Sequence, residues 1–238
     1  MDRKFRKQIK SDRFAQEVTH TFDWVGHHKA LVTRYGSIAL AVVLVVAGIY
    51  YYVRYQAARR EDAYAQAVRI DNATVGAAQP PAPGGLTFAT EDQKDKARAK
   101  AFGDLTAKYH GSAEGAIAEM FLASDAADKG DLAGAEKMYK DVMDSAPEAY
   151  ASLARVSLAH VEAAEGKQAD ADKLLRDAVA HPSVTVSKED ATIQLGRLIS
   201  KDQPDEARKL LEPLRTSPRA AVSRAALTAL GEIASLNK

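Results

Sequence analysis

KGDLAGAEKMYKDVMDSAP, residues 129–147, decides the fold because the same pattern returns twice farther along the chain. EGKQADADKLLRDAVAHPS (165–183) and KDQPDEARKLLEPLRTSPR (201–219) align with it without gaps, and each copy begins 36 residues after the one before. Self-similarity at a fixed period of this length is typical of architectures built from stacked units. We therefore expect an array of similar units rather than one closed core.

Two columns of this alignment predict how the units pack. A small residue occupies the first column, and a large apolar residue follows four positions later, one helical turn on. The six residues are Ala135, Tyr139, Ala171, Leu175, Ala207 and Leu211. The small residue lets two helices approach closely and the large one fills the space between them. Because one helix pair cannot bury its apolar face alone, the pairs stack, and we predict an all-α helical-repeat solenoid over residues 91–238.

The helix ends follow from regularly spaced loop residues. A third apolar column, three positions after the second, extends each second helix at Val142, Ala178 and Leu214. Prolines follow at or near one position of every copy and end these helices: Pro147, Pro182 and Pro218. The segment 219–236, RAAVSRAALTALGEIASL, is predicted to be the closing helix.

Residues 35–53, YGSIALAVVLVVAGIYYYV, carry no charge. As a helix these 19 residues span roughly 28 Å, close to the ~30 Å hydrocarbon core of a bilayer. Tyrosines stand at both ends, with Arg34 and Arg54 beyond them, as is typical of membrane interfaces rather than of a buried core helix. We predict a single transmembrane helix over residues 35–54, which includes Gly36, Val42, Leu44, Val46 and Val53.

The charge distribution favours one orientation of this helix. Residues 1–35 hold eight Lys or Arg against four Asp or Glu, whereas residues 55–238 hold 24 against 28. A basic tail (1–34) favours the cytoplasm and places the domain outside, although the charges nearest the span are level or slightly adverse. A cytosol-facing domain is the alternative. The tail itself is either a helix on the anionic inner leaflet or a solvated segment.

Two segments connect the span to the repeats. Residues 55–72 continue the helix, and residues 73–90 form a Pro/Gly-rich linker or insertion with no regular structure expected. The helical patterns on either side of this insertion, at 60–71 and at 95–112, are predicted to form a degenerate extra helix pair.

The columns resemble the second helix of the tetratricopeptide repeat, whose pattern of Ala, large residue, Ala and Pro is matched by Ala135, Tyr139, Val142 and Pro147. The Leu-Gly pair of that repeat's first helix is matched by Leu195 and Gly196 in the third copy, while Ala123 and Thr192 depart from the family's usual residues.

The whole layout resembles a bacterial inner-membrane family of ancillary secretory-translocon subunits, which has a basic tail, one span and a short tetratricopeptide-like domain. The resemblance implies a bacterial inner-membrane protein with a cytoplasmic N-terminus and a periplasmic domain. It also implies translocon subunits, a periplasmic chaperone and secretory clients as protein partners, besides membrane lipid. The insertion around residues 80–85, PPAPGG, departs from the family pattern.

In tetratricopeptide arrays the first helices line a concave groove, and the resemblance implies groove candidates on them. These are Ile117, Met120, Ser124, Val156 and His160. Apolar side chains such as Met and Val suit extended segments or partner helices. The alternative is that some of the five are core residues between helices.

Residues that would carry chemistry form no recognisable motif. The chain has no Cys, which excludes disulfides and thiolate sites, and Asp131 stands where a helix cap belongs. The adjacent His27 and His28 would point about 100° apart on a helix, which suits no ligand pair. Gly84 and Gly85 lack the Lys that a phosphate-binding loop needs. We predict no catalytic residue, cofactor, metal, nucleic acid or small-molecule substrate.

We therefore expect a membrane-anchored protein-interaction module, an ancillary subunit of the secretory translocon that links it to periplasmic chaperones or secreted clients. The alternative is a structural accessory or assembly subunit of another inner-membrane complex.

Overall fold

The structure is a computed structural model that describes residues 29–76 and 85–236, with side chains from residue 33 to residue 235 outside the gap. Most of the predicted tail (1–34), including His27 and His28, and the middle of the predicted insertion (73–90) lie outside these residues. The chain divides into two compact units, Met1–Arg59 and Arg60–Lys238, which are described separately.

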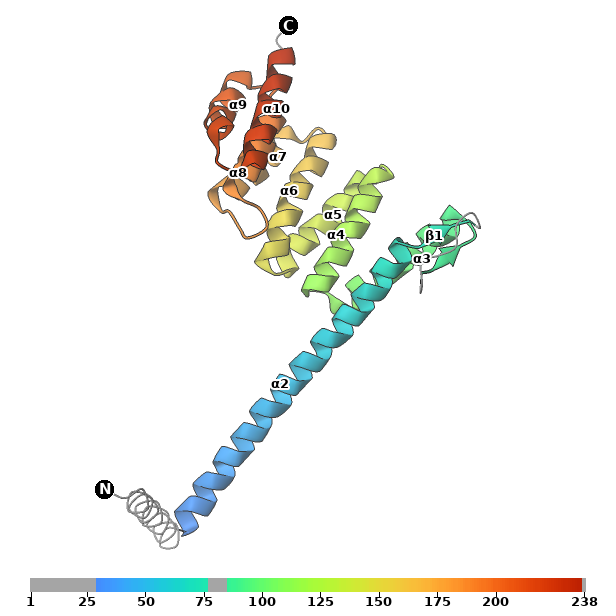
Figure 1. Cartoon of the computed structure of the whole chain (residues 1–238), viewed down its shortest axis with the longest axis vertical. Coiled ribbons are helices and arrows are strands. Elements are labelled where there is room, and N and C mark those ends of the chain that lie inside the picture. The colour runs from blue at the N-terminus through green and yellow to red at the C-terminus, as the bar shows by residue number, and fades with distance from the viewer. Residues whose placement is uncertain (1–28, 77–84, 237–238) are drawn as a thin grey trace, which may run out of the picture. The chain divides into compact units, whose positions relative to one another are not determined.

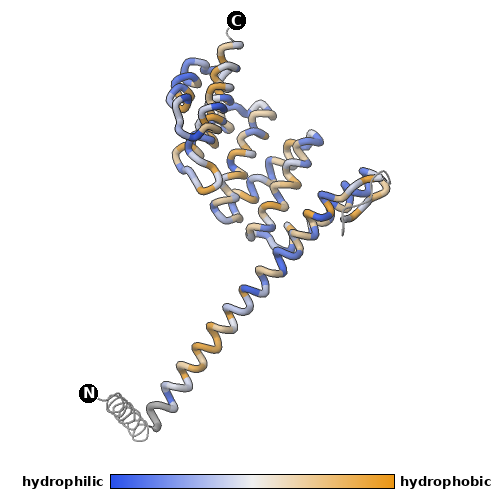
Figure 2. The backbone as a smooth tube through the Cα atoms, viewed as in Figure 1, coloured by the Kyte–Doolittle hydropathy of each residue, from blue (hydrophilic) through white to orange (hydrophobic). Residues whose placement is uncertain are grey.

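The described part of the first unit is one helix. It is the first part of α2 (Lys29–Asp71), and its apolar side chains are exposed. All five residues named for the predicted span are exposed, and Figure 2 shows the hydrophobic stretch along this helix. The helix is long and apolar enough to cross a membrane, as predicted.

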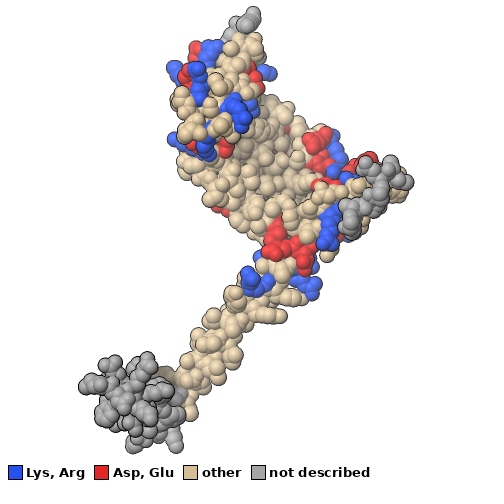
Figure 3. All heavy atoms as spheres, in the orientation of Figure 1, with Lys and Arg blue, Asp and Glu red and all other residues tan. Residues whose placement is uncertain are grey.

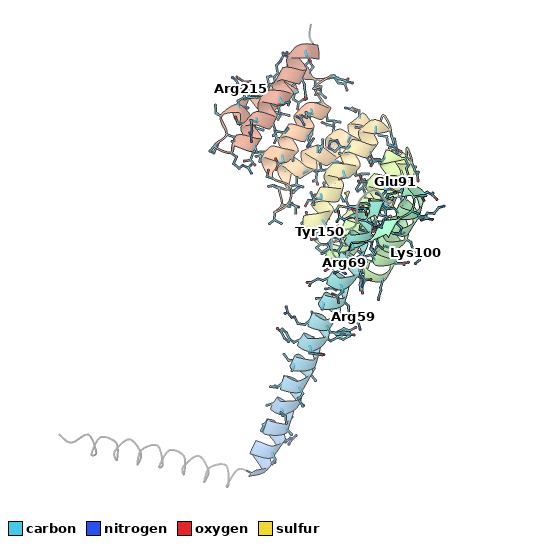
Figure 4. All side chains as sticks on the ribbon, turned by 45° about the vertical axis from the view of Figure 1, so that its right-hand side comes forward. Arg59, Arg69, Glu91, Lys100, Tyr150 and Arg215 are labelled. Carbon is cyan, nitrogen blue, oxygen red and sulfur yellow. The ribbon has the colours of Figure 1, made fainter. Side chains whose placement is uncertain are left out.

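The second unit is an α-helical repeat domain (Figure 1), and each helix contacts the next along the chain. Figure 4 labels Arg69 near the end of α2, and Glu91 and Lys100 on α3. The helices after α2 are α3 (Glu91–Tyr109), α4 (Ala113–Asp128), α5 (Leu132–Ser145), α6 (Glu148–Ala164), α7 (Gln168–Ala180), α8 (Lys188–Leu198), α9 (Pro204–Leu211), the 3₁₀ helix η1 (Glu212–Thr216) and α10 (Ala220–Leu236). The predicted all-α solenoid after an apolar N-terminal helix is confirmed.

A short parallel bridge lies where the sequence predicted no regular structure. β1 (Thr74–Val75) pairs with β2 (Thr87–Phe88), with Thr74 opposite Thr87. The Thr74 amide donates to the Leu86 carbonyl, and the two threonine hydroxyls lie 3.1 Å apart. β-Branched residues favour this extended conformation, which brings the two ends of the insertion together.

Glycines and caps set the loops at the predicted places. Gly130 and Gly166, one repeat period apart, follow α4 and α6 with φ of 85° and 80°, a conformation that favours glycine. The next amide in each loop, from Asp131 or Lys167, donates back to a carbonyl in the last turn of the helix. Asp131 then caps α5 by accepting a hydrogen bond from the Gly134 amide, as the sequence indicated.

The two packing columns are buried throughout. The side chains of Ala135, Ala171, Ala207, Leu175 and Leu211 have 0% exposure, and Tyr139 has 6%. At Gly196, an added Cβ would lie 2.8 Å from Cγ of Leu211, closer than atoms pack. The absence of a side chain at Gly196 is therefore what allows α8 to approach α9.

The third repeat departs from the predicted length of its second helix. α9 ends at Leu211 and continues as the 3₁₀ helix η1, so Leu214 of the third column is only half-buried, whereas Val142 and Ala178 are buried. Pro213 has no amide hydrogen to donate in an α-helical turn. The chain therefore forms a 3₁₀ helix there in place of a further α-helical turn. The last helix, α10, contacts both η1 and α8.

Replacing Gly196 with Ala should destabilise the full-length protein in detergent micelles by about 1–3 kcal/mol, because the new methyl group overpacks a fully buried contact. Gly231→Ala in α10 is the matched control. Nothing lies within 4 Å of its added Cβ. It should therefore gain about 0.5–1 kcal/mol from helix propensity alone. Urea unfolding followed by circular dichroism checks both, and equal effects of the two substitutions would contradict this packing.

Candidate functional site

The five predicted groove residues lie on two helices that pack directly on each other, α4 and α6. On α4, Ile117 and Met120 are half-buried and Ser124 is exposed. On α6, Val156 is half-buried and His160 is exposed. Met120 and Val156 also pack against the core, so both lie at its edge. We call these five residues the inner strip.

The buried side chain of Tyr139 lies behind the inner strip. Its side chain extends from α5, and its hydroxyl group lies near the hydroxyl groups of Ser124 on α4 and Ser157 on α6. Burial raises the pKa of Tyr139, so the phenol stays protonated and neutral. A side chain of α5 therefore lies against both α4 and α6 beside the inner strip.

The inner strip is uncharged at neutral pH. Partial burial lowers the pKa of His160, so its imidazole is neutral at neutral pH. In Figure 3, charged residues gather towards the two ends of the repeat domain, and its middle, where Figure 1 draws α4 and α6, carries little charge colour. This surface suits apolar or backbone groups of a partner better than charged ones.

A hollow lies between α5 and α7, over α6, and has a volume of about 810 Å³. We call it the outer groove. Its lining is mostly charged and includes residues of both signs. These are Glu136, Lys140, Met143, Arg155, Glu162, Lys167, Asp170, Lys173, Leu174, Arg176 and Asp177. None of the inner-strip residues lines it.

An ion-pair network closes one side of the outer groove. The Glu136 carboxylate accepts hydrogen bonds from Lys140 and from Lys167, the latter at 2.6 Å, and Lys167 also pairs with Glu165 at 2.7 Å. Hydrogen bonds from the two lysines lower the pKa of Glu136 to about 2. Burial raises the pKa of the neighbouring Glu162, whose Oε1 lies 3.8 Å from Lys140 Nζ.

The structure also brings together three side chains that no sequence motif connects. His110 follows α3, Glu119 lies on α4 and Asp141 lies on α5. His110 Nε2 is 2.8 Å from Asp141 Oδ2, and a carboxylate oxygen of Glu119 lies within 4.8 Å of both side chains. Burial and the Asp141 charge raise the pKa of Glu119 to about 7. Gaps of nine and 22 residues follow no metal-ligand spacing, so sequence reasoning missed the cluster.

Comparison with known proteins gives one match. A family model described as a tetratricopeptide repeat-like domain matches residues 29–210. No curated protein matches the chain. No solved structure matches it either.

The ion pairs of Glu136 should make stability depend on pH. Its pKa is lower in the folded than in the unfolded chain, so its stabilisation is full above about pH 4.5 and is lost as the pH falls towards 2. Glu136→Gln should therefore cost about 1 kcal/mol at neutral pH, allowing for solvent screening, and less near pH 2.5.

Urea unfolding of the full-length protein in micelles at both pH values checks this. Glu212→Gln, which removes an exposed pair with Arg215, is the control and should change stability little at either pH. A loss at Glu136 that is the same at both pH values would contradict the assignment.

Proposed function

Because the chain belongs to the family of tetratricopeptide repeat-like domains, which are protein-interaction modules, we propose that it is a membrane-anchored binding subunit with no catalytic role. The inner strip of α4 and α6 is the binding surface. The observation that supports this most is that the strip is solvent-accessible and uncharged in a chain with 27% charged residues.

The apolar part of α2 is the anchor. None of this apolar stretch is buried inside the protein. An exposed apolar surface of this length is unfavourable in water but is satisfied by the hydrocarbon of a bilayer. The basic tail then lies in the cytoplasm of a bacterial cell and the repeat domain in the periplasm.

The proposed partners are translocon subunits in the membrane, with secretory clients or a periplasmic chaperone at the inner strip. An unfolded secretory chain offers backbone amides and apolar side chains, which an uncharged strip edged by Met and Val can contact. Tethering to the membrane raises the effective concentration of the strip near a translocon, so weak contacts suffice.

In-cell photo-crosslinking tests this proposal. A photoreactive residue at position 120 or 160 should capture secretory chains or a periplasmic chaperone, and one at position 45 should capture translocon subunits. Position 173, an exposed residue of the outer groove, is the control and should capture far less of the same clients. Mass spectrometry identifies the partners.

Other outcomes separate the alternatives. Crosslinks from positions 120, 160 and 45 to one defined membrane complex, without secretory clients, would contradict the translocon proposal and make the chain a structural accessory or assembly subunit. Crosslinks from 120 and 160 to cytosolic proteins would overturn the proposed orientation.

A further inference from the structure

Three elements converge on His110, Glu119 and Asp141. One potential ligand atom of each, an imidazole nitrogen or a carboxylate oxygen, lies within 4.8 Å of both others. Glu119 is 7% exposed and forms the floor of the cluster, whereas the side chains of His110 and Asp141 are 51% and 47% exposed. One side of the cluster therefore faces solvent.

The cluster places two carboxyl groups beside one imidazole nitrogen. Two carboxylate groups this close repel each other, and a cation bound between them removes that repulsion. The imidazole nitrogen of His110 offers a lone pair that a metal cation can bind. The arrangement therefore suits a small cation that several groups share.

We propose that His110, Glu119 and Asp141 bind one divalent first-row transition-metal cation of the Zn²⁺ class. One nitrogen and two carboxylate oxygens are a ligand set that Zn²⁺ accepts, whereas Ca²⁺ and Mg²⁺ prefer oxygen alone. Metal–ligand bonds of about 2.0–2.2 Å in a tetrahedron place ligand atoms about 3.3–3.6 Å apart. The side chains of His110 and Asp141 are exposed enough to adjust to that spacing.

The same chain contains an ordinary pair for comparison. His181 Nδ1 lies 2.9 Å from Asp177 Oδ1 on α7, and both side chains are exposed. The two residues are four apart at the C-terminal end of α7, and they are not part of a group of three potential ligands within the described residues. The cluster of His110, Glu119 and Asp141 differs from this pair in two ways. It has a third ligand group, the buried carboxyl group of Glu119, and its residues come from three separate elements.

Metal binding would join three successive elements of the array. His110 stands in the turn between α3 and α4, and Asp141 lies on α5. A shared cation would fasten the first helix pair of the repeat domain to the second and leave a fourth ligand position open to water or to a partner's side chain. This would stabilise the metal-bound folded state.

Titration of the full-length protein in detergent micelles with Zn²⁺ tests the site, by calorimetry and by competition with a chelator. His20, His27 and His28 are replaced with Ala in every sample so that they do not compete. The protein should bind one Zn²⁺, and His110→Ala, Glu119→Gln and Asp141→Asn should each weaken binding by about ten-fold or more. His181→Ala should bind as the parent does.

A second readout separates loss of the site from loss of the fold. Zn²⁺ should raise the melting temperature of the parent and of His181→Ala, but not of His110→Ala or Asp141→Asn, which change exposed side chains. Absence of saturable Zn²⁺ binding by the parent would overturn the proposal. Binding by His110→Ala and Asp141→Asn that equals the parent's would overturn it as well.

Discussion

The close approach of helices at positions with almost no side chain is the constraint on which the repeat domain depends. Ala135, Ala171 and Ala207 are fully buried, and Gly196 leaves no room for a Cβ against Leu211. Since each helix contacts mainly its neighbours along the chain, a bulky side chain at one junction would displace everything stacked beyond it. The same closeness lets Tyr139 reach Ser124 and Ser157, so the packing rule also shapes the candidate surface.

Two surfaces of different character follow from this stacking. α4 packs directly on α6, and their shared edge carries the uncharged inner strip. α5 and α7 are separated by the outer groove, where Glu136 and Lys167 belong to a charged network. Charges that meet one another across the outer groove contribute to stability, whereas the strip exposes uncharged side chains that a partner can contact.

The period of 36 residues was enough to predict the helices and their stops, because small, large and turn residues recur at fixed places in every copy. Features that depend on one local residue were harder to predict, such as the 3₁₀ turn imposed by Pro213 or the bridge between Thr74 and Thr87. The five strip residues were named from the resemblance to tetratricopeptide arrays, whose first helices line a concave groove. The cluster of Glu119 and Asp141 with His110 depends on side chains from three elements, and nothing in the order of residues brings them together.

Partner recovery by variants of the full-length protein in cells tests the central claim, that the edge of α4 and α6 is the binding surface. His160→Arg adds bulk and charge to the strip at an exposed position, and Lys173→Glu makes a comparable change at the outer groove. With helicity and membrane insertion unchanged in both, His160→Arg should lose the co-purified partner and Lys173→Glu should keep it. Loss of the partner by Lys173→Glu, with retention by His160→Arg, would contradict the account and place binding at the outer groove.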